Sequence, residues 1–254
     1  MRASDCAGAT NPRPNASETV KPDMSIRYEP IDPPDWRSGL KELKTPLEFL
    51  KLARAWRHLP STPSPRPRTV VLLPGFGAYE SSMALLGRYL RRLGHDVHGW
   101  GLGRNTGRVP ELLDQLGPRI ASLSEATGAP LIAVGWSLGG YLAREAARDD
   151  PARFEKIVTI GSPVIGGPRF TAAAKWYQGK GFDLGEIERL VAERYCAPLQ
   201  TPVTAIYSRS DGVVAWEACI DHWSPNVRHV EVDCSHLGMG FSPEVIAIVA
   251  DAIG

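Results

Sequence analysis

A serine flanked by glycines follows a short apolar run, and this segment constrains the fold more than any other. Residues 131–134 read Leu-Ile-Ala-Val, which predicts a short buried strand. The pentapeptide Gly-Trp-Ser-Leu-Gly follows at 135–139, and residues 141–148 have the composition of a helix. A serine on a sharp turn between a strand and a helix is the context in which Gly-x-Ser-x-Gly indicates a nucleophile.

The glycines of this segment have a physical explanation if Ser137 lies on a strained turn. Gly135 and Gly139 leave room where side chains would strike the neighbouring strand and helix. The backbone N–H of Leu138 would point from the start of the helix, where partial positive charge favours an oxyanion. A turn whose serine only caps the helix is the alternative. The flanking strand and helix favour the nucleophile.

Composition limits the classes of protein to consider. A chain of 254 residues with 43% hydrophobic residues is typical of one α/β domain with a sizeable core. The net charge of +1 gives no reason to expect nucleic acid as a partner. The apolar runs are too short to span a bilayer, and no secretory signal follows Met1, so a cytoplasmic location is expected.

The cysteines show no close metal-ligand spacing, so we expect no metal site. Free thiols in a reducing compartment are the simplest account of Cys6, Cys196, Cys219 and Cys234. A bridge between Cys219 and Cys234 stays open as an alternative.

The first part of the chain differs from the rest. Residues 1–34 are polar and proline-bearing, which predicts a disordered tail. Residues 35–68 are expected to form a docked helix followed by a proline-rich linker. In that helix the residues that share an apolar face are Leu47, Leu50 and Ala53, with Phe49 and Trp56. Because the opposite face is basic, peripheral membrane contact through residues 46–58 is the alternative use of this helix.

Residues 69–254 alternate between apolar strands and amphipathic helices. The expected strands are 69–73, 95–100, 131–134, 154–160, 203–208 and 228–232. Such alternation predicts an α/β fold with a mostly parallel central sheet and helices on both faces. Residues 164–200 are longer than one crossover needs and carry several aromatic residues, so they are expected to form a small cap over the site.

A serine nucleophile needs a base and an acid that orients it. His236 lies in a glycine-bearing loop after the last strand and is the predicted base; a helix-cap contact is its alternative role. Asp211 follows the strand at 203–208 and is the predicted acid, although Asp-Gly is also a plain turn signal. Asp233 is the second choice of acid. The chain order Ser137, Asp211, His236 is the order expected of one group of serine triads.

The second oxyanion donor is expected from the loop after the first strand of this domain. Phe76, in Pro-Gly-Phe-Gly at 74–77, is assigned this role, so its N–H would act beside that of Leu138. The alternative is a glycine turn that only reverses the chain. Residues 101–105 are glycine-rich but lack the residues and spacing of a phosphate-binding loop, so nucleotide binding is not favoured. The predicted pocket residues are Asn105, Trp136 and Trp176.

Together these segments resemble the α/β-hydrolase superfamily, and within it the lipase and esterase-like serine hydrolases. The resemblance covers residues 69–254 and rests on the segments at 72–77, 135–140, 160–163, 210–214 and 235–238. It implies hydrolysis of a carboxylic ester through an acyl-enzyme, with no cofactor and a small-molecule ester or lipid as substrate. The chain departs from many relatives in having Pro74-Gly75 where they have His-Gly.

The resemblance leaves other activities open. A thioesterase or an acyltransferase would use the same triad, and a cofactor-free haloperoxidase would use the same fold. A non-catalytic α/β-hydrolase-fold binding protein would keep the fold without turnover. The sequence predicts no oligomeric state.

Overall fold

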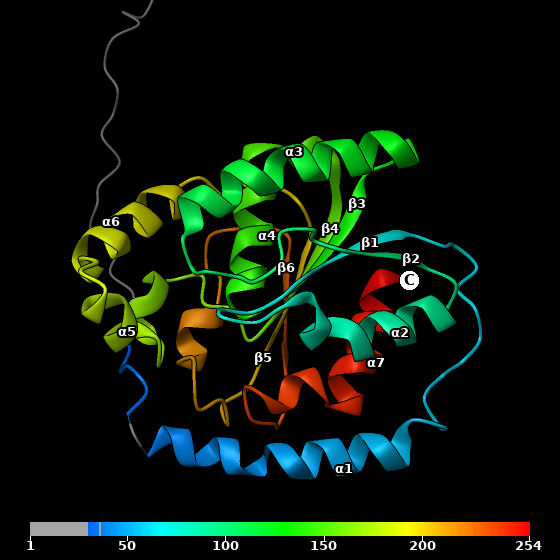
Figure 1. Cartoon of the computed structure of the whole chain (residues 1–254), viewed down its shortest axis with the longest axis horizontal. Coiled ribbons are helices and arrows are strands. Elements are labelled where there is room, and N and C mark those ends of the chain that lie inside the picture. The colour runs from blue at the N-terminus through cyan, green and yellow to red at the C-terminus, as the bar shows by residue number, and fades with distance from the viewer. Residues whose placement is uncertain (1–29, 36) are drawn as a thin grey trace, which may run out of the picture.

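A six-stranded, all-parallel sheet forms the centre of the computed structural model, which describes residues 30–35 and 37–254 (Figure 1). The strand order is β2-β1-β3-β4-β5-β6. The strands are β1 (Thr69–Leu73), β2 (Asp96–Gly99), β3 (Leu131–Trp136), β4 (Phe154–Ile160), β5 (Val203–Tyr207) and β6 (Val227–Glu231). The predicted parallel sheet is confirmed.

Helices cover both faces of the sheet, because alternate residues of each strand are apolar on opposite sides. Val70 and Leu72 of β1 belong to the core cluster shared with α2 (Ala84–Arg92) and α7 (Pro243–Ile253). Val71 and Leu73 belong to the cluster shared with α3 (Val109–Thr127) and α4 (Leu138–Asp149). Figure 1 shows these two helix pairs on opposite sides of the strands. The expected α/β class is therefore confirmed.

The strand order creates a natural place for a site. After β1 the chain crosses to the sheet edge at β2, whereas after β3 it crosses the other way to β4. The loops that follow β1 and β3 therefore separate at the carboxyl ends of adjacent strands. Crevices of this kind are where ligands bind in open α/β sheets.

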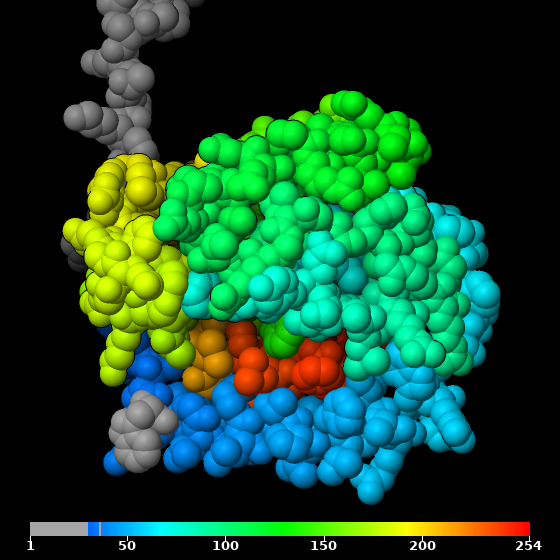
Figure 2. All heavy atoms as spheres, in the orientation of Figure 1, coloured from blue at the N-terminus to red at the C-terminus, as the bar shows by residue number. Residues whose placement is uncertain are grey.

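The segment after β4 contains short helices that lie beside the carboxyl ends of the strands. They are a 3-10 turn (Gly167–Phe170), α5 (Ala174–Gly179) and α6 (Leu184–Tyr195). Figure 2 shows this segment, in yellow and yellow-green, as a separate lobe next to the green helices. We call residues 164–200 the cap segment, and its role as a cap stays a prediction.

The N-terminal part of the described chain forms a 3-10 helix (Ser38–Lys44) that continues into α1 (Thr45–Ala55). Both lie along one side of the molecule, in blue in Figure 1, below the C-terminal segments. Residues 1–29 of the predicted tail lie outside the described residues, and residues 30–34 have no regular secondary structure.

The predicted orientation of α1 is wrong. Leu47 and Leu50 are 56% and 50% exposed, whereas Glu48 and Leu52 are 5% and 4% exposed. The reason is that α1 packs against the loop after β6 as well as against α7. Glu48 closely approaches Gly238 of that loop. The face that carries Leu47 and Leu50 therefore points outward.

Two further observations bear on the sequence-based expectations. The structure has Cys196, Cys219 and Cys234 as free thiols, so the alternative bridge is not formed. In the described part of the chain no helix combines the length and apolarity needed to cross a membrane. The cytoplasmic location stays a prediction.

Candidate active site

Ser137 occupies a strained turn between β3 and α4. Its φ of 53° and ψ of −122° make it the one non-glycine residue with positive φ among the residues that the structure describes. A side chain at such a φ is costly and persists only where the surroundings impose it. The Ser137 N–H donates to the carbonyl of Ile160 on β4 at 2.7 Å, which ties the turn to the neighbouring strand.

The surrounding glycines are required by close backbone approach. A Cβ on Gly135 would lie 2.3 Å from the backbone nitrogen of Gly140. A Cβ on Gly139 would lie 2.2 Å from the carbonyl oxygen of Leu73 on β1. Both distances are far inside van der Waals contact, so the sequence reasoning about these two glycines agrees with the structure.

Asp211 and His236 meet in a buried hydrogen bond between two loops that follow β5 and β6. His236 Nδ1 lies 2.6 Å from Asp211 Oδ2, and both side chains are almost fully buried. The other carboxylate oxygen, Oδ1, accepts the backbone N–H groups of Val213 and Val214 at 2.8 Å each. With Asp211 ionised, Nδ1 carries the proton, and Nε2 is left as the proton acceptor.

Electrostatics favours a basic imidazole at this site. Burial alone lowers the pKa of His236, but the negative charges of Asp211 and Glu42 outweigh it and raise that pKa above its ordinary 6.5. Such a group is suited to take a proton from a hydroxyl and return it to a leaving group.

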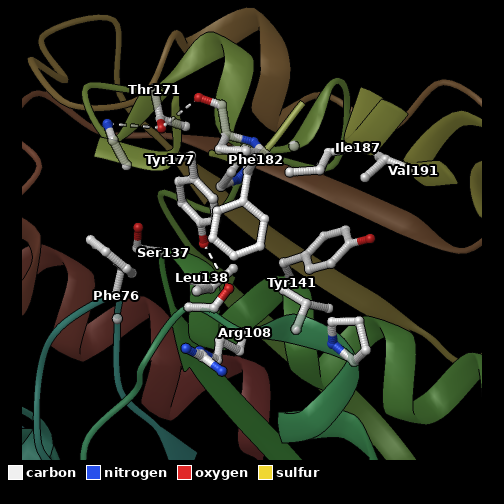
Figure 3. A pocket seen from close by; sticks show the side chains of 18 of the residues that line it. Phe76, Arg108, Ser137, Leu138, Tyr141, Thr171, Tyr177, Phe182, Ile187 and Val191 are labelled. Carbon is white, nitrogen blue, oxygen red and sulfur yellow. Dashed lines mark hydrogen bonds between the residues drawn. The ribbon is translucent and has the colours of Figure 1, made fainter. Parts of the chain in front are cut away.

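Ser137 and His236 line the same cavity, and Figure 3 shows the Ser137 side chain beside Phe76 at the cavity wall. Ser137 and His236, both within the described residues, are not joined by a direct hydrogen bond. Bonds between a nucleophile and its base are often long before substrate binds. The structure places the predicted nucleophile and base on one cavity, with the predicted acid bonded to the base.

Other candidate bases and acids are engaged elsewhere. His95 accepts the N–H of Arg68, and His229 accepts that of Asp221. Asp233, the second choice of acid, accepts the hydroxyl of Ser210 at 2.7 Å on the surface.

The two predicted oxyanion donors also border the cavity. Leu138 is the first residue of α4, so its N–H has no acceptor within the helix. Phe76 lies in the loop after β1, and both residues line the cavity with Ser137. A Cβ on Gly75 would lie 3.4 Å from the Ser137 Cβ, so this loop passes close to the serine.

The cavity beside Ser137 has a volume of about 1090 Å³. Figure 3 shows Tyr177 and Phe182 from the cap segment opposite Tyr141 of α4. Ile187 and Val191 of α6 add aliphatic surface. The predicted pocket residue Trp136 lines the cavity as well. This is a large and mainly apolar site of the kind that takes a small ligand.

Trp176 is not a pocket residue, which corrects the prediction. Its side chain is 41% exposed and packs edge-on against Phe76, with ring centroids 4.9 Å apart. It lies outside the cavity lining because α5 directs Tyr177, not Trp176, toward the interior. The Tyr177 hydroxyl donates to the carbonyl of Gly107 at 2.8 Å, which joins the cap to the body.

Asn105 is also not a pocket residue. It is completely buried behind the loop, where its Nδ2 donates to the Pro74 carbonyl at 2.9 Å. Its Oδ1 accepts the Gly107 N–H at 3.1 Å. Because Asn105 satisfies both backbone groups, its contacts fix the loop that carries Phe76. The glycine stretch before it is no phosphate cradle, since the Gly101 N–H donates to the Glu80 carboxylate at 2.6 Å.

Comparison with solved structures decides the fold. A lipolytic enzyme from the metagenome-derived pair LipS and LipT superposes with a TM-score of 0.56 at 19% identity, covering 77% of this chain and 98% of that one. A putative lipase from Acinetobacter baumannii gives 0.54 at 15% identity, covering 76% and 87%. The hydrolase BphD from Rhodococcus gives 0.53 at 15% identity, covering 75% and 92%. The chain has the α/β-hydrolase fold.

Curated relatives are also found by sequence. Several are named pimeloyl-[acyl-carrier protein] methyl ester esterase, two of them from Pectobacterium. The one from Pectobacterium carotovorum is 32% identical over 63% of this chain and 62% of its own length. The one from Pectobacterium atrosepticum is 32% identical over 52% of each chain. The matches thus span between about half and three-fifths of these two relatives. No family model matches the chain.

Sequence reasoning missed several residues of this candidate site. Tyr141, Tyr177, Phe182 and Ile187 line the cavity, and only their apolar character in and near the cap segment gave a signal. It also missed Glu42, which accepts the His236 N–H at 2.9 Å from outside the sheet. No local motif marks that contact, because the two residues are far apart in the chain.

Proposed function

We propose that this α/β-hydrolase cleaves carboxylic esters with an apolar acyl group through a serine acyl-enzyme. The observation that carries the proposal is the buried Asp211–His236 hydrogen bond on the same cavity as the strained Ser137. A buried histidine held by a carboxylate is of use mainly to a group that exchanges protons, and Ser137 is the hydroxyl on that cavity wall next to the expected oxyanion donors.

In the proposed reaction the Ser137 hydroxyl oxygen forms a bond to the ester carbonyl carbon while its proton passes to His236 Nε2. The carbonyl oxygen becomes an oxyanion that accepts the N–H groups of Phe76 and Leu138. Collapse breaks the bond to the alkoxy group, which leaves as an alcohol with the proton from His236. A water molecule then repeats the sequence on the acyl-enzyme and releases the acid, and Asp211 keeps the imidazole in the reactive tautomer throughout.

The cavity supports an apolar acyl chain. Tyr177, Phe182, Ile187 and Val191 present rings and methyl groups to its interior. Its volume of about 1090 Å³ is slightly above the range usual for small-ligand sites, so a chain of several methylene groups has room. The names of the curated relatives, which describe a methyl ester esterase, support oxygen esters over thioesters as the substrate.

The test compares wild type, Ser137→Ala and Ser81→Ala, a control in which an exposed serine is removed. We expect a fluorophosphonate probe to label wild type and the control but not Ser137→Ala, and ester turnover to follow the label. A panel of p-nitrophenyl esters and acyl-CoA thioesters of increasing length then separates esterase from thioesterase. Unchanged ester turnover in Ser137→Ala refutes the proposal, and a wild-type protein that neither takes the label nor turns over any ester favours a binding protein.

We also propose that α1 contacts an anionic lipid surface. Its Leu47, Phe49 and Leu50 are each half or more exposed, and Arg54 and Arg57 lie exposed nearby. The carboxylates of Glu42 and Glu48 face the protein. The outward surface of α1 is therefore apolar and cationic. That combination is typical of helices that lie in the bilayer interface.

Co-sedimentation with vesicles tests this contact. We expect binding to vesicles of phosphatidylcholine with phosphatidylglycerol, weaker binding to phosphatidylcholine alone, and loss of binding in a Leu47→Ser, Leu50→Ser double variant. Trp223→Ala, which removes an exposed aromatic elsewhere, serves as the control. A concentration-dependent dimer that the double variant abolishes, without vesicle binding by wild type, contradicts the lipid proposal.

A further inference from the structure

The 3-10 helix at Ser38–Lys44 lies across the two loops that carry Asp211 and His236. Glu42 makes the central contact. Its Oε1 accepts the N–H of Gly212 at 3.0 Å and that of His236 at 2.9 Å. Its Oε2 accepts the N–H of Leu237 at 2.9 Å. The Glu42 carboxylate therefore links Gly212, which follows the predicted acid, to His236 and Leu237.

Neighbouring residues of the same segment strengthen the contact. Lys41 Nζ donates to the carbonyl of Arg209 at 3.1 Å and lies 3.4 Å from that of Asp211. The hydroxyls of Thr45 and Ser235 are 2.9 Å apart. The acid loop and the base loop are thus each bonded to this N-terminal segment as well as to each other.

The loops are shaped to receive this segment. A Cβ on Gly212 would lie 2.3 Å from the carbonyl oxygen of Ser38 and 2.9 Å from Glu42 Oε1. A Cβ on Gly238 would lie 2.8 Å from Glu48 Cγ. The Gly212 collision is with backbone, which cannot move aside without shifting the whole segment. A glycine immediately after Asp211 is therefore needed for the N-terminal segment to dock.

From these contacts we infer that Glu42 is a positioning residue, which holds the Asp211 and His236 loops in the relative placement that proton transfer requires. The inference rests on the proposed ester hydrolysis, since it assigns Glu42 a part in that reaction. Glu42 acts through His236 and is not itself among the residues that line the cavity. Hydrogen bonds from backbone N–H groups to a carboxylate are stronger than those to neutral acceptors, so a single side chain suffices.

The charge of Glu42 affects the His236 pKa, and a loss of stability alone does not. The groups whose charges bear on the His236 imidazole are Asp211 and Glu42, and Lys41 lies close to the Asp211 backbone. Glu42 contributes to raising the pKa of His236. Removing its charge therefore lowers that pKa, whereas a merely less stable fold leaves it unchanged in the molecules that stay folded.

Glu42→Gln tests the inference, because it keeps the shape while removing the charge and turning one acceptor into a donor that faces the Leu237 N–H. The control is Glu155→Gln, which neutralises a surface carboxylate paired with Arg68 at the other end of the strands. We expect Glu42→Gln to lower kcat per fluorophosphonate-titrated site by about 10- to 100-fold with KM nearly unchanged, as for a small misplacement of a catalytic group. We expect the control to match wild type.

The second measurement is the His236 pKa, followed by nuclear magnetic resonance of its Cε1–H during a pH titration. We expect a lower pKa in Glu42→Gln than in wild type. Because this titration needs no turnover, it tests Glu42 even if the protein proves inactive on esters, which would refute only the proposed function. Wild-type kcat, or a lowered kcat with an unchanged His236 pKa, overturns the inference. Should Glu42→Gln not fold, Gly212→Ala keeps the charge but pushes the segment away, and an unchanged His236 pKa in that variant overturns it.

Discussion

Replacement of Asp211 by Asn offers the sharpest examination of the proposed triad, because the structure dictates how the amide must orient. Asp211 Oδ1 accepts two backbone N–H groups, those of Val213 and Val214. In the variant the amide oxygen has to keep that position, since an amide NH₂ there would face two donors. The NH₂ group then points at His236 Nδ1. That nitrogen becomes an acceptor, the proton moves to Nε2, and the base can no longer take the proton of Ser137.

The size of the effect follows from two estimates. An imidazolium and a carboxylate about 4 Å apart attract by about 4 kcal/mol at an effective dielectric constant of 20, so losing the charge alone slows the reaction about a thousandfold. The wrong tautomer raises the loss to about ten-thousandfold, the size known for this change in serine triads. The geometry of the loop is retained, so the free energy of unfolding should change far less than kcat.

The assay measures kcat on a p-nitrophenyl ester at pH 8. Asp233→Asn is the matched control, because Asp233 is close to His236 in sequence but bonds to Ser210 on the surface. We expect a loss of about three to four orders of magnitude in Asp211→Asn and nearly full activity in the control. If Asp211→Asn keeps more than about a tenth of the wild-type kcat, or if the control loses as much, the orienting role of Asp211 is refuted.

Three further outcomes follow from the site. The raised pKa of His236 places the acid limb of kcat/KM above pH 6.5, with activity rising as the imidazole loses its proton, and a pH series checks this. Asn105→Ala leaves a buried carbonyl and a buried amide unpaired, which costs about 2 kcal/mol and lowers Tm by about 6 °C on calorimetry, with a reduced kcat as the oxyanion loop loosens. Gly139→Ala forces a methyl group against the Leu73 carbonyl and costs about 3 kcal/mol on denaturant unfolding, whereas Gly117→Ala, with open space around it in α3, is neutral or stabilising.

The sheet and the order of its strands and helices were predictable because each strand and helix has a recognisable pattern of apolar residues. The strands at Thr69–Leu73 and Phe154–Ile160 have the boundaries predicted from their apolar runs. Pro243 marks the start of α7, and the strands β2 and β6 lie within a residue of the expected ranges at each end. The parallel arrangement follows from the alternation of strands with helices. For these elements local composition and tertiary packing demand the same structure.

The placement of Asp211 and His236 was predictable for a related reason. Both follow strands of one parallel sheet, so topology alone brings their loops to the same edge. Strand-end position does not separate them from Asp233, which follows the last strand more closely than His236 does. Asp211 was preferred because Asp233 is too near His236 in a short loop, and in the structure Asp233 bonds to Ser210 on the surface.

The errors concern residues whose environment comes from distant segments. Asn105 and Trp176 were predicted to line the pocket because of where they lie along the chain. The structure gives Asn105 a buried role behind the Pro74 carbonyl and gives Trp176 an exposed one against Phe76. Which side of a loop or short helix faces a cavity depends on the partner that packs against its other side, and no local pattern records that partner.

The orientation of α1 shows the same limit in its strongest form, and it explains why Glu42 was missed. Periodicity places Leu47, Leu50 and Ala53 on one face and assumes that an apolar face must be the buried one. This segment docks on a pair of loops whose N–H groups need acceptors, so the carboxylates of Glu42 and Glu48 turn inward. Leu47 and Leu50 turn outward, and only Leu52 among the leucines of α1 packs in the core. A helical segment that docks by accepting backbone N–H groups turns its carboxylates toward the protein, so its apolar residues can face solvent. Burial of Glu48 and the bonds of Glu42 thus have one cause, which is that this segment packs on the loops of Asp211 and His236.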